Sequence, residues 1–209
     1  MLAPTVDLDQ PNGARVDNAL LGGGYNFAVD RQTAATLLAA DPTVVDRLCA
    51  RQTDVRRVTG YALDLGIRQF LHLGCGIPFP WGIHTVIQRR HSSGHVVYVD
   101  DDPVVVELIR HAFGEDMTVG ACEADPDDLD TVCTHDETRR LVDLAEPMAV
   151  VLTRPAGNER DLAGTIAALR GIVAPRSLLA VVPDGRASEV VTVPCDATRA
   201  AVIGMGATT

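Results

Sequence analysis

The chain has 209 residues, of which 46% are hydrophobic, and its formal net charge is −10 at pH 7. This length and composition are enough to bury one substantial core, so we expect a single structural domain. All eighteen basic residues are arginines scattered along the chain, which argues against the broad positive surface that nucleic-acid binding needs.

Two further classes are disfavoured by simple features of the sequence. No run approaches eighteen apolar residues, and the segment MLAPTVDLDQ lacks the basic and apolar regions of a signal peptide, so we expect a cytoplasmic protein without a membrane partner. The five cysteines are odd in number and form no C-x-x-C pair. They therefore favour reduced thiols over a disulfide framework or a structural metal site.

Residues 1–66 predict an N-terminal arm followed by a helical cap. The first fourteen residues are rich in Pro, Gly, Asn and Asp, which is typical of a loose arm. The glycines at 22–24 must end any helix that precedes them. Apolar residues at helical spacing then predict helices over 30–40 and 42–65.

Residues 67–209 predict a Rossmann-like core, because short β-branched runs alternate there with helical stretches. Strands are predicted over 69–73, 95–100, 117–122, 148–153 and 177–182. The intervening helices are predicted over 82–90, 103–113, 127–133 and 159–173. Two final β runs, at 190–193 and 200–204, predict an antiparallel edge hairpin. The expected fold is an α/β sheet with helices on both faces and an N-terminal helical cap.

The first two strands end in residues suited to a nucleoside. Gly74 and Gly76 in F-L-H-L-G-C-G-I-P let the backbone approach a ligand at the carboxyl end of a parallel strand. Asp100 ends the second strand about 24 residues after Gly76, where an acid can accept hydrogen bonds from ribose hydroxyls. The alternatives are an ordinary tight turn for the glycines and a helix cap for Asp100, although Asp102 before Pro103 is the better cap candidate.

Three segments resemble the actinobacterial S-adenosyl methyltransferase family, formerly known only as a domain of unknown function. They are A-R-V-D-N-A-L-L-G-G-G-Y-N-F-A-V-D-R at 14–31, G-I-R-Q-F-L-H-L-G-C-G-I-P at 66–78 and V-V-Y-V-D-D-D-P-V-V at 96–105. The similarity continues through 142–152 and weakens after about residue 180. It implies a class I methyltransferase fold, S-adenosyl-L-methionine as cofactor and a small-molecule substrate, by family analogy one of specialised metabolism.

The resemblance also implies where the cofactor lies. Gly74 and Gly76 would border it, and Asp100 would hold its ribose. The L-L-G-G-G-Y-N-F element would cover the crevice as a lid, and a lid that excludes water strengthens the electrostatic interactions inside. The residues assigned to the cofactor in this way are Gly22, Gly23, Asn26, Gly74, Cys75, Gly76, Asp100, Asp102, Cys122 and Glu123.

The chain departs from the family pattern around this crevice. His72 stands where the family typically has an acid, so a contact with the positively charged amino-acid end of the cofactor is lost. Arg51 and Gln52 replace an expected Asn-Arg pair in the long N-terminal helix. Cys122 stands where the family has an Asp that can contact the adenine, with Glu123 beside it as a candidate substitute. The C-terminal part is also shorter than the family leads one to expect.

Two other functions stay open beside the leading methyltransferase hypothesis, for which a homodimer is a candidate oligomeric state. A redirected pocket could use His72, His84 or Cys75 as general acid or base in a cyclisation, isomerisation or elimination that needs no cofactor. A regulatory pseudoenzyme could instead keep the fold and bind another protein without turnover.

Overall fold

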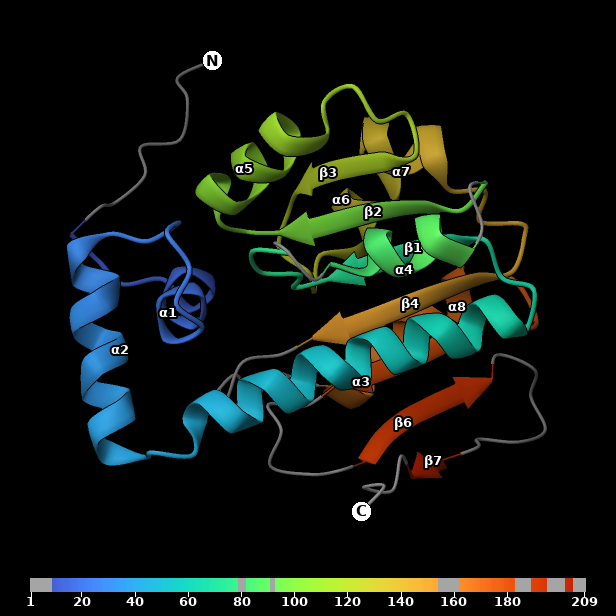
Figure 1. Cartoon of the computed structure of the whole chain (residues 1–209). Coiled ribbons are helices and arrows are strands. Elements are labelled where there is room, and N and C mark those ends of the chain that lie inside the picture. The colour runs from blue at the N-terminus through green and yellow to red at the C-terminus, as the bar shows by residue number, and fades with distance from the viewer. Residues whose placement is uncertain are drawn as a thin grey trace.

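A seven-stranded sheet forms the centre of the computed structural model, which describes residues 9–78, 82–90, 93–153, 162–182, 189–194 and 202–204. Its strands are β1 (Gln69–Leu73), β2 (His95–Asp100), β3 (Val119–Glu123), β4 (Met148–Thr153), β5 (Leu178–Val182), β6 (Glu189–Pro194) and β7 (Val202–Gly204). They lie in the order β3-β2-β1-β4-β5-β6-β7 (Figure 1). The first five are parallel, and β6 and β7 extend the sheet by antiparallel pairing, as the last two β runs predict.

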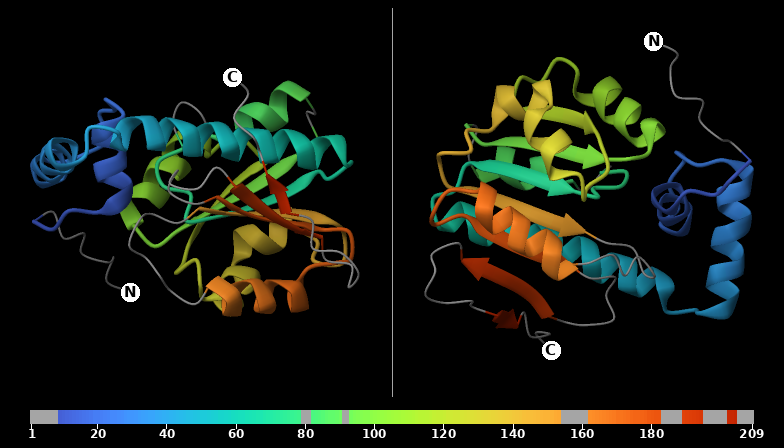
Figure 2. Two further views of the ribbon diagram at one scale, coloured as in Figure 1. Left: turned by 90° about the horizontal axis from the view of Figure 1, so that it is seen from below. Right: turned by 180° about the vertical axis from the view of Figure 1, so that it is seen from behind.

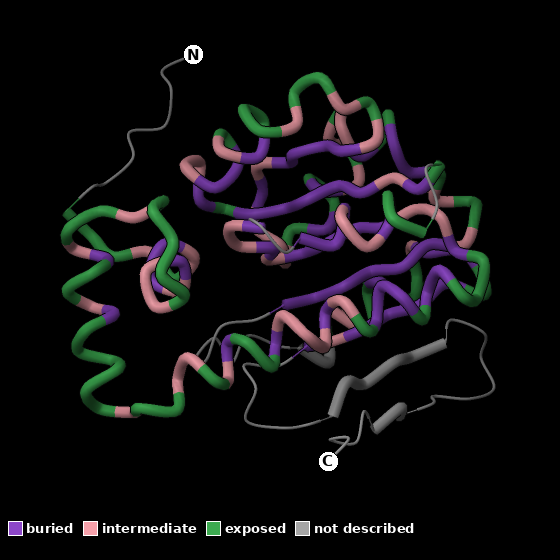
Figure 3. The backbone as a smooth tube through the Cα atoms, viewed as in Figure 1, coloured by how far each residue is buried: buried purple, intermediate pink, exposed green. Residues whose placement is uncertain are grey.

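The parallel strands are buried on both faces (Figure 3). All six residues of β4 are buried, and in β1 the neighbours Phe70 and Leu71 belong to core clusters on opposite faces of the sheet. A strand covered on both faces needs apolar side chains at every position and not at alternate ones. This is why these segments are continuous apolar runs in the sequence.

Helices cover both faces of the sheet. In chain order, the helices of the described residues are α1 (Gly13–Leu20), α2 (Ala28–Ala40), α3 (Val44–Asp64), α4 (Ile83–Arg90), α5 (Pro103–Phe113), α6 (Leu129–Thr134), α7 (Asp136–Leu141) and α8 (Leu162–Ile172). The buried residues of α3, α4 and α5 form one core cluster with the sheet, and those of α6, α7 and α8 form the other. Figure 2 shows the sheet between the cyan helix α3 and the orange helix α8. The predicted Rossmann-like α/β fold is confirmed.

The helices α1 and α2 stand beyond the ends of the strands, where the arrowheads of β2, β3 and β4 point in Figure 1. Asn12 caps α1 by accepting a hydrogen bond from the Ala14 amide at 2.8 Å. The helix then ends before Gly22, whose φ of +76° favours glycine. The glycine run therefore ends the helix as expected and turns the chain toward α2.

Within the described residues, the predicted and observed elements differ mainly in two features. The third strand begins at Val119 and not at residue 117, because Asp116 accepts hydrogen bonds from the amide and hydroxyl of Thr118 and so forms a turn there. Helix α7 was not predicted. Parts of two predicted elements, 159–161 and 200–201, lie outside the described residues. None of the helices in the described ranges has both the length and the apolar character that a membrane span requires.

Candidate functional site

A crevice lies where the carboxyl ends of β1 and β2 face α1 and α3. It consists of two adjoining cavities of about 140 and 530 Å³. The residues that line both are Ala14, Asp17, Arg51, Gln52, Cys75 and Gly76. Ligands of open parallel sheets bind at this end of the strands, and the larger cavity has the size of a small-molecule pocket.

The loop after β1 is shaped by its two glycines. Gly74 and Gly76 have φ angles of +65° and +60°, a conformation that other residues rarely adopt. A Cβ atom on Gly74 would lie 2.5 Å from the backbone oxygen of Thr153. The amides of Gly74 and Cys75 both donate to the carbonyl of Val99, at 3.0 and 3.1 Å. The loop is thus bound to β2 and pressed against β4, and only glycine fits at its first position.

Asp100 is buried at the end of β2 and contacts this loop. Its Oδ2 accepts a hydrogen bond from the Gly76 amide at 2.8 Å, and its Oδ1 accepts one from the Asp102 amide at 3.1 Å. Burial raises the pKa of Asp100 to about 6, against the opposing effect of the two amides. Oδ2 also accepts a hydrogen bond from the Cys75 thiol at 3.9 Å, so the second lone pair of Oδ1 is the one that can accept a hydrogen bond from a ligand.

His72 reaches the crevice from β1. Its Nε2 lies 2.6 Å from Thr153 Oγ1, while its Nδ1 is buried without a hydrogen-bond partner in the described part of the chain. Burial and the nearby positive charge of Arg51 lower the pKa of His72 to about 3, so the ring is neutral at physiological pH. A group with such a pKa is a weak general base.

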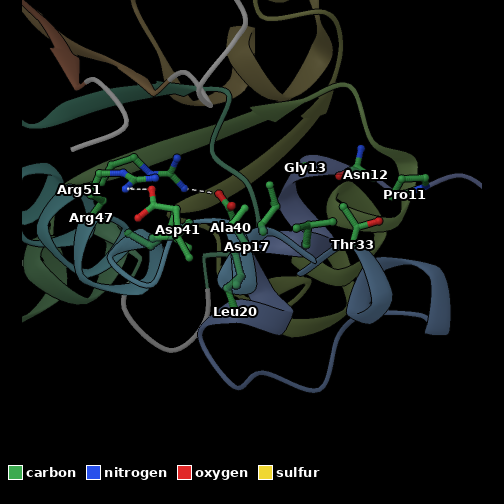
Figure 4. A pocket seen from close by; sticks show the side chains of 14 residues that line it. Pro11, Asn12, Gly13, Asp17, Leu20, Thr33, Ala40, Asp41, Arg47 and Arg51 are labelled. Carbon is green, nitrogen blue, oxygen red and sulfur yellow. Dashed lines mark hydrogen bonds and ion pairs between the residues drawn. The ribbon is translucent and has the colours of Figure 1, made fainter. Parts of the chain in front are cut away.

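Arg51 and Asp17 form an ion pair across the crevice, between Nη2 on α3 and Oδ2 on α1. Arg51 is largely buried, and among the described atoms its Nε has no hydrogen-bond partner. Both residues also border a third cavity of about 460 Å³ between α1, α2 and α3 (Figure 4). A second ion pair, between Asp41 and Arg47, lines the same cavity. The Asp17–Arg51 pair is therefore a shared wall of three cavities.

The turn between α1 and α2 borders the larger cavity. Gly22 and Gly23 line it. Asn26 does not belong to the described lining, but its Nδ2 donates to the Gly23 carbonyl at 2.7 Å and to Asn18 Oδ1 at 3.0 Å. The predicted lid residues thus lie together, with Asn26 shaping the turn that Gly22 and Gly23 present to the crevice.

His84 and Asp102 are placed elsewhere. The Nδ1 of His84 lies 2.7 Å from the Tyr98 hydroxyl, and its ring packs edge-on against Phe113 at 4.4 Å, so burial lowers the pKa of His84 to about 4. Asp102 caps α5 by accepting a hydrogen bond from the Val104 amide at 2.9 Å. Neither His84 nor Asp102 lines either crevice cavity among the described residues.

Cys122 and Glu123 also lie away from the two cavities. Cys122 is fully buried in the core cluster beneath α6 and α7, and burial raises the pKa of its thiol to about 11. Glu123 ends β3 and lies 4.0 Å from Arg110. Neither is among the described lining residues, and no group of three or more metal-binding side chains occurs in the described ranges.

Asp17 was not assigned to the site from the sequence, and Arg51 was noted only as a departure from the family pattern. Their contact joins two helices across 34 positions of the chain. No local spacing encodes such a contact, because it depends on how α1 crosses α3. The only signal in the sequence was Arg51 itself, which with Gln52 replaces the Asn-Arg pair expected from the family.

Comparison with known proteins was consistent with this arrangement. A family model described as S-adenosyl methyltransferase matches residues 1–194. A crystal structure of a Thermobifida fusca protein described as a methyltransferase is 31% identical, with a TM-score of 0.79 over 85% of this chain and 68% of that one. A DUF574 family protein from Streptomyces avermitilis is 27% identical, with a TM-score of 0.77 over 84% and 70%. No curated protein matches the chain.

Proposed function

The chain belongs to the S-adenosyl methyltransferase family, and from this premise we propose that it transfers a methyl group from S-adenosylmethionine to a nucleophilic atom of a small molecule. When bound, the cofactor supplies a methyl group activated by its positive sulfonium. The observation that carries the proposal is the meeting of the Gly74–Gly76 loop with the buried Asp100 carboxylate at the ends of β1 and β2.

The adenosine part of the cofactor is proposed to lie against this loop. Asp100 is fixed by two backbone amides and the Cys75 thiol, so the second lone pair of Oδ1 is held ready for a ribose hydroxyl. Gly76 carries no side chain that would narrow the smaller cavity, and Cys75 lines it alongside. The residues present therefore fit a nucleoside with a free diol.

The contribution of the protein to the reaction is proposed to be alignment in a closed crevice. The turn with Gly22 and Gly23 lines the larger cavity and can exclude water from it. Holding the methyl group and the acceptor atom in the right orientation lowers the activation free energy without acid–base chemistry. Burial raises the pKa of the Cys75 thiol and leaves His72 neutral, so neither is suited to proton transfer near pH 7. This favours transfer to an acceptor that is already nucleophilic over cofactor-independent acid–base catalysis.

A small acceptor is supported by the cavity volume of about 530 Å³ and by the net charge of −10, which is unfavourable for nucleic acid. A place in specialised metabolism rests on family likeness alone.

Calorimetric titration with S-adenosylmethionine and S-adenosylhomocysteine tests this proposal. Saturable binding is expected for the wild type, and Asp100→Asn should weaken it about 10-fold to 100-fold, the effect of losing hydrogen bonds to a charged group. The matched control is Asp130→Asn, an exposed carboxylate on α6. Folding of each variant is checked by thermal melting. No binding by folded wild type at millimolar ligand would refute the proposal, whereas equal binding by Asp100→Asn would refute only the role of Asp100.

A further inference from the structure

We infer that Asp17, Arg51 and His72 form a subsite for a zwitterionic α-amino-acid group. The inference rests on the proposed function, under which this group is the methionine end of the cofactor. Its position follows from the lining of the smaller cavity, where the three residues lie together with Gly74, Gly76 and Asp100. A ligand whose ribose is at Asp100 therefore extends toward the ion pair within one cavity.

Arg51 provides the anion-binding half of this subsite. A guanidinium has five N–H donors in a planar fork, and Asp17 engages Nη2. The Nε of Arg51 is buried with no hydrogen-bond partner among the described atoms, which is costly unless a ligand satisfies it. A carboxylate fits this need, because it accepts parallel hydrogen bonds from such a fork.

Asp17 provides the cation-binding half. Its side chain is 26% exposed although it is paired, and it lines the smaller cavity, so its carboxylate can accept a further hydrogen bond there. An ammonium group there would neutralise Asp17 while the ligand carboxylate turns to Arg51. The acid that β1 lacks at position 72 is thereby supplied by α1, whose Asp17 lines the same cavity as His72.

His72 completes the subsite with its Nδ1, which, like Arg51 Nε, is buried without a hydrogen-bond partner among the described residues. Because Thr153 Oγ1 can donate to or accept from Nε2, either tautomer of the neutral ring is available. One tautomer lets Nδ1 donate to a carboxylate, and the other lets it accept from an ammonium. A neutral ring adds no charge to the pair, so the subsite as a whole has no net charge.

This balance of charge selects the ligand class. A zwitterion brings one charge of each sign into a site with one charge of each sign, so no buried charge is left uncompensated. A phosphate would instead place negative charge beside Asp17. The subsite thus favours an amino-acid end over the pyrophosphate of a dinucleotide, which also binds at glycine-rich turns of such sheets.

The test compares ligands that share adenosine and differ beyond it. S-adenosylhomocysteine carries the amino-acid end, 5′-deoxy-5′-methylthioadenosine lacks it, and ADP carries a pyrophosphate in its place. Each is titrated by calorimetry into wild type, Asp17→Asn and Arg51→Gln, with folding confirmed by thermal melting. The control is Asp41→Asn, which alters the other ion pair of the third cavity and lies outside the crevice.

Asp17→Asn and Arg51→Gln should each weaken S-adenosylhomocysteine about 10-fold to 100-fold and methylthioadenosine less than about 3-fold. Asp41→Asn should change neither. Equal weakening of both nucleosides, or tighter binding of ADP than of S-adenosylhomocysteine to the wild type, would overturn the inference and leave the proposed function standing. If the wild type bound neither nucleoside at millimolar concentration, the proposed function would fall and the inference with it. Should Arg51→Gln not fold, the partly exposed Asp17→Asn decides the matter.

Discussion

The Asp100 carboxylate is buried, and burial disfavours its charged form. Two amides hold it, yet burial dominates and raises its pKa to about 6. The folded protein therefore binds a proton at Asp100 more tightly than the unfolded chain, whose Asp has a pKa near 3.8. By linkage, the contribution of Asp100 to stability is complete below about pH 4 and is lost as the pH rises through about 6.

This predicts that Asp100→Asn gains stability relative to the wild type as the pH rises. The side chain of Asn does not titrate, so the difference in unfolding free energy between variant and wild type should move by about 3 kcal/mol in favour of the variant from pH 4 to pH 8. Urea denaturation of both proteins across this range measures it. A difference that stays constant with pH would show that Asp100 has an ordinary pKa in the folded state.

At the scale of elements, sequence patterns predicted the strands and long helices but missed a short polar helix and a contact that depends on tertiary packing. Apolar runs located β1 to β5, because strands buried on both faces must be apolar throughout. Helix α7 has the sequence DETRRL, in which Leu141 is the only apolar residue, so it shows no apolar period. The glycines and Asp100 were found because they follow strands directly. The Asp17–Arg51 pair was not, since it depends on the packing of α1 against α3.

The loop after β1 gives a prediction at this scale. Gly74→Ala should lower the unfolding free energy by at least about 2 kcal/mol, because a left-handed residue with a Cβ is strained and that atom would lie 2.5 Å from the Thr153 oxygen. Gly171→Ala, in the last turn of α8 with open space around it, should instead raise stability by up to about 1 kcal/mol. Denaturant melts decide the issue, and a Gly74→Ala protein as stable as the wild type would mean that the loop rearranges easily.

At the scale of the whole molecule, Arg15 joins the N-terminal helices to the sheet domain. Its Nε lies 3.5 Å from carboxylate oxygens of both Asp30 on α2 and Asp102 at the start of α5, and its guanidinium lies over the Phe27 ring at 5.1 Å. All three charged side chains are at most 4% exposed. One buried cation thus compensates two buried acids on different elements.

Arg15→Met should therefore destabilise the protein by about 3 kcal/mol or more, since removing one partner leaves buried charges uncompensated. We propose that residues 1–66 act as a cap on the core of 67–209, so limited proteolysis should cut the variant first within the cap. Arg57→Met, which removes a partly exposed ion pair with Asp54, should cost less than about 1 kcal/mol. Similar losses in both variants would contradict a special role for Arg15.

The strand order has a consequence for how the chain folds. Strand β1, the middle one of the five parallel strands, pairs with β4 in a register that joins Gln69 to Met148, so one of its edges has no partner until the chain has been made past that point. Pairing across such a separation requires closing a long loop, and the chain entropy is lost before the contact stabilises the sheet. This slows the folding of parallel sheets. A nascent chain that stops short of β4 leaves this edge of β1 unpaired, and pairing with another chain there competes with completion of the sheet.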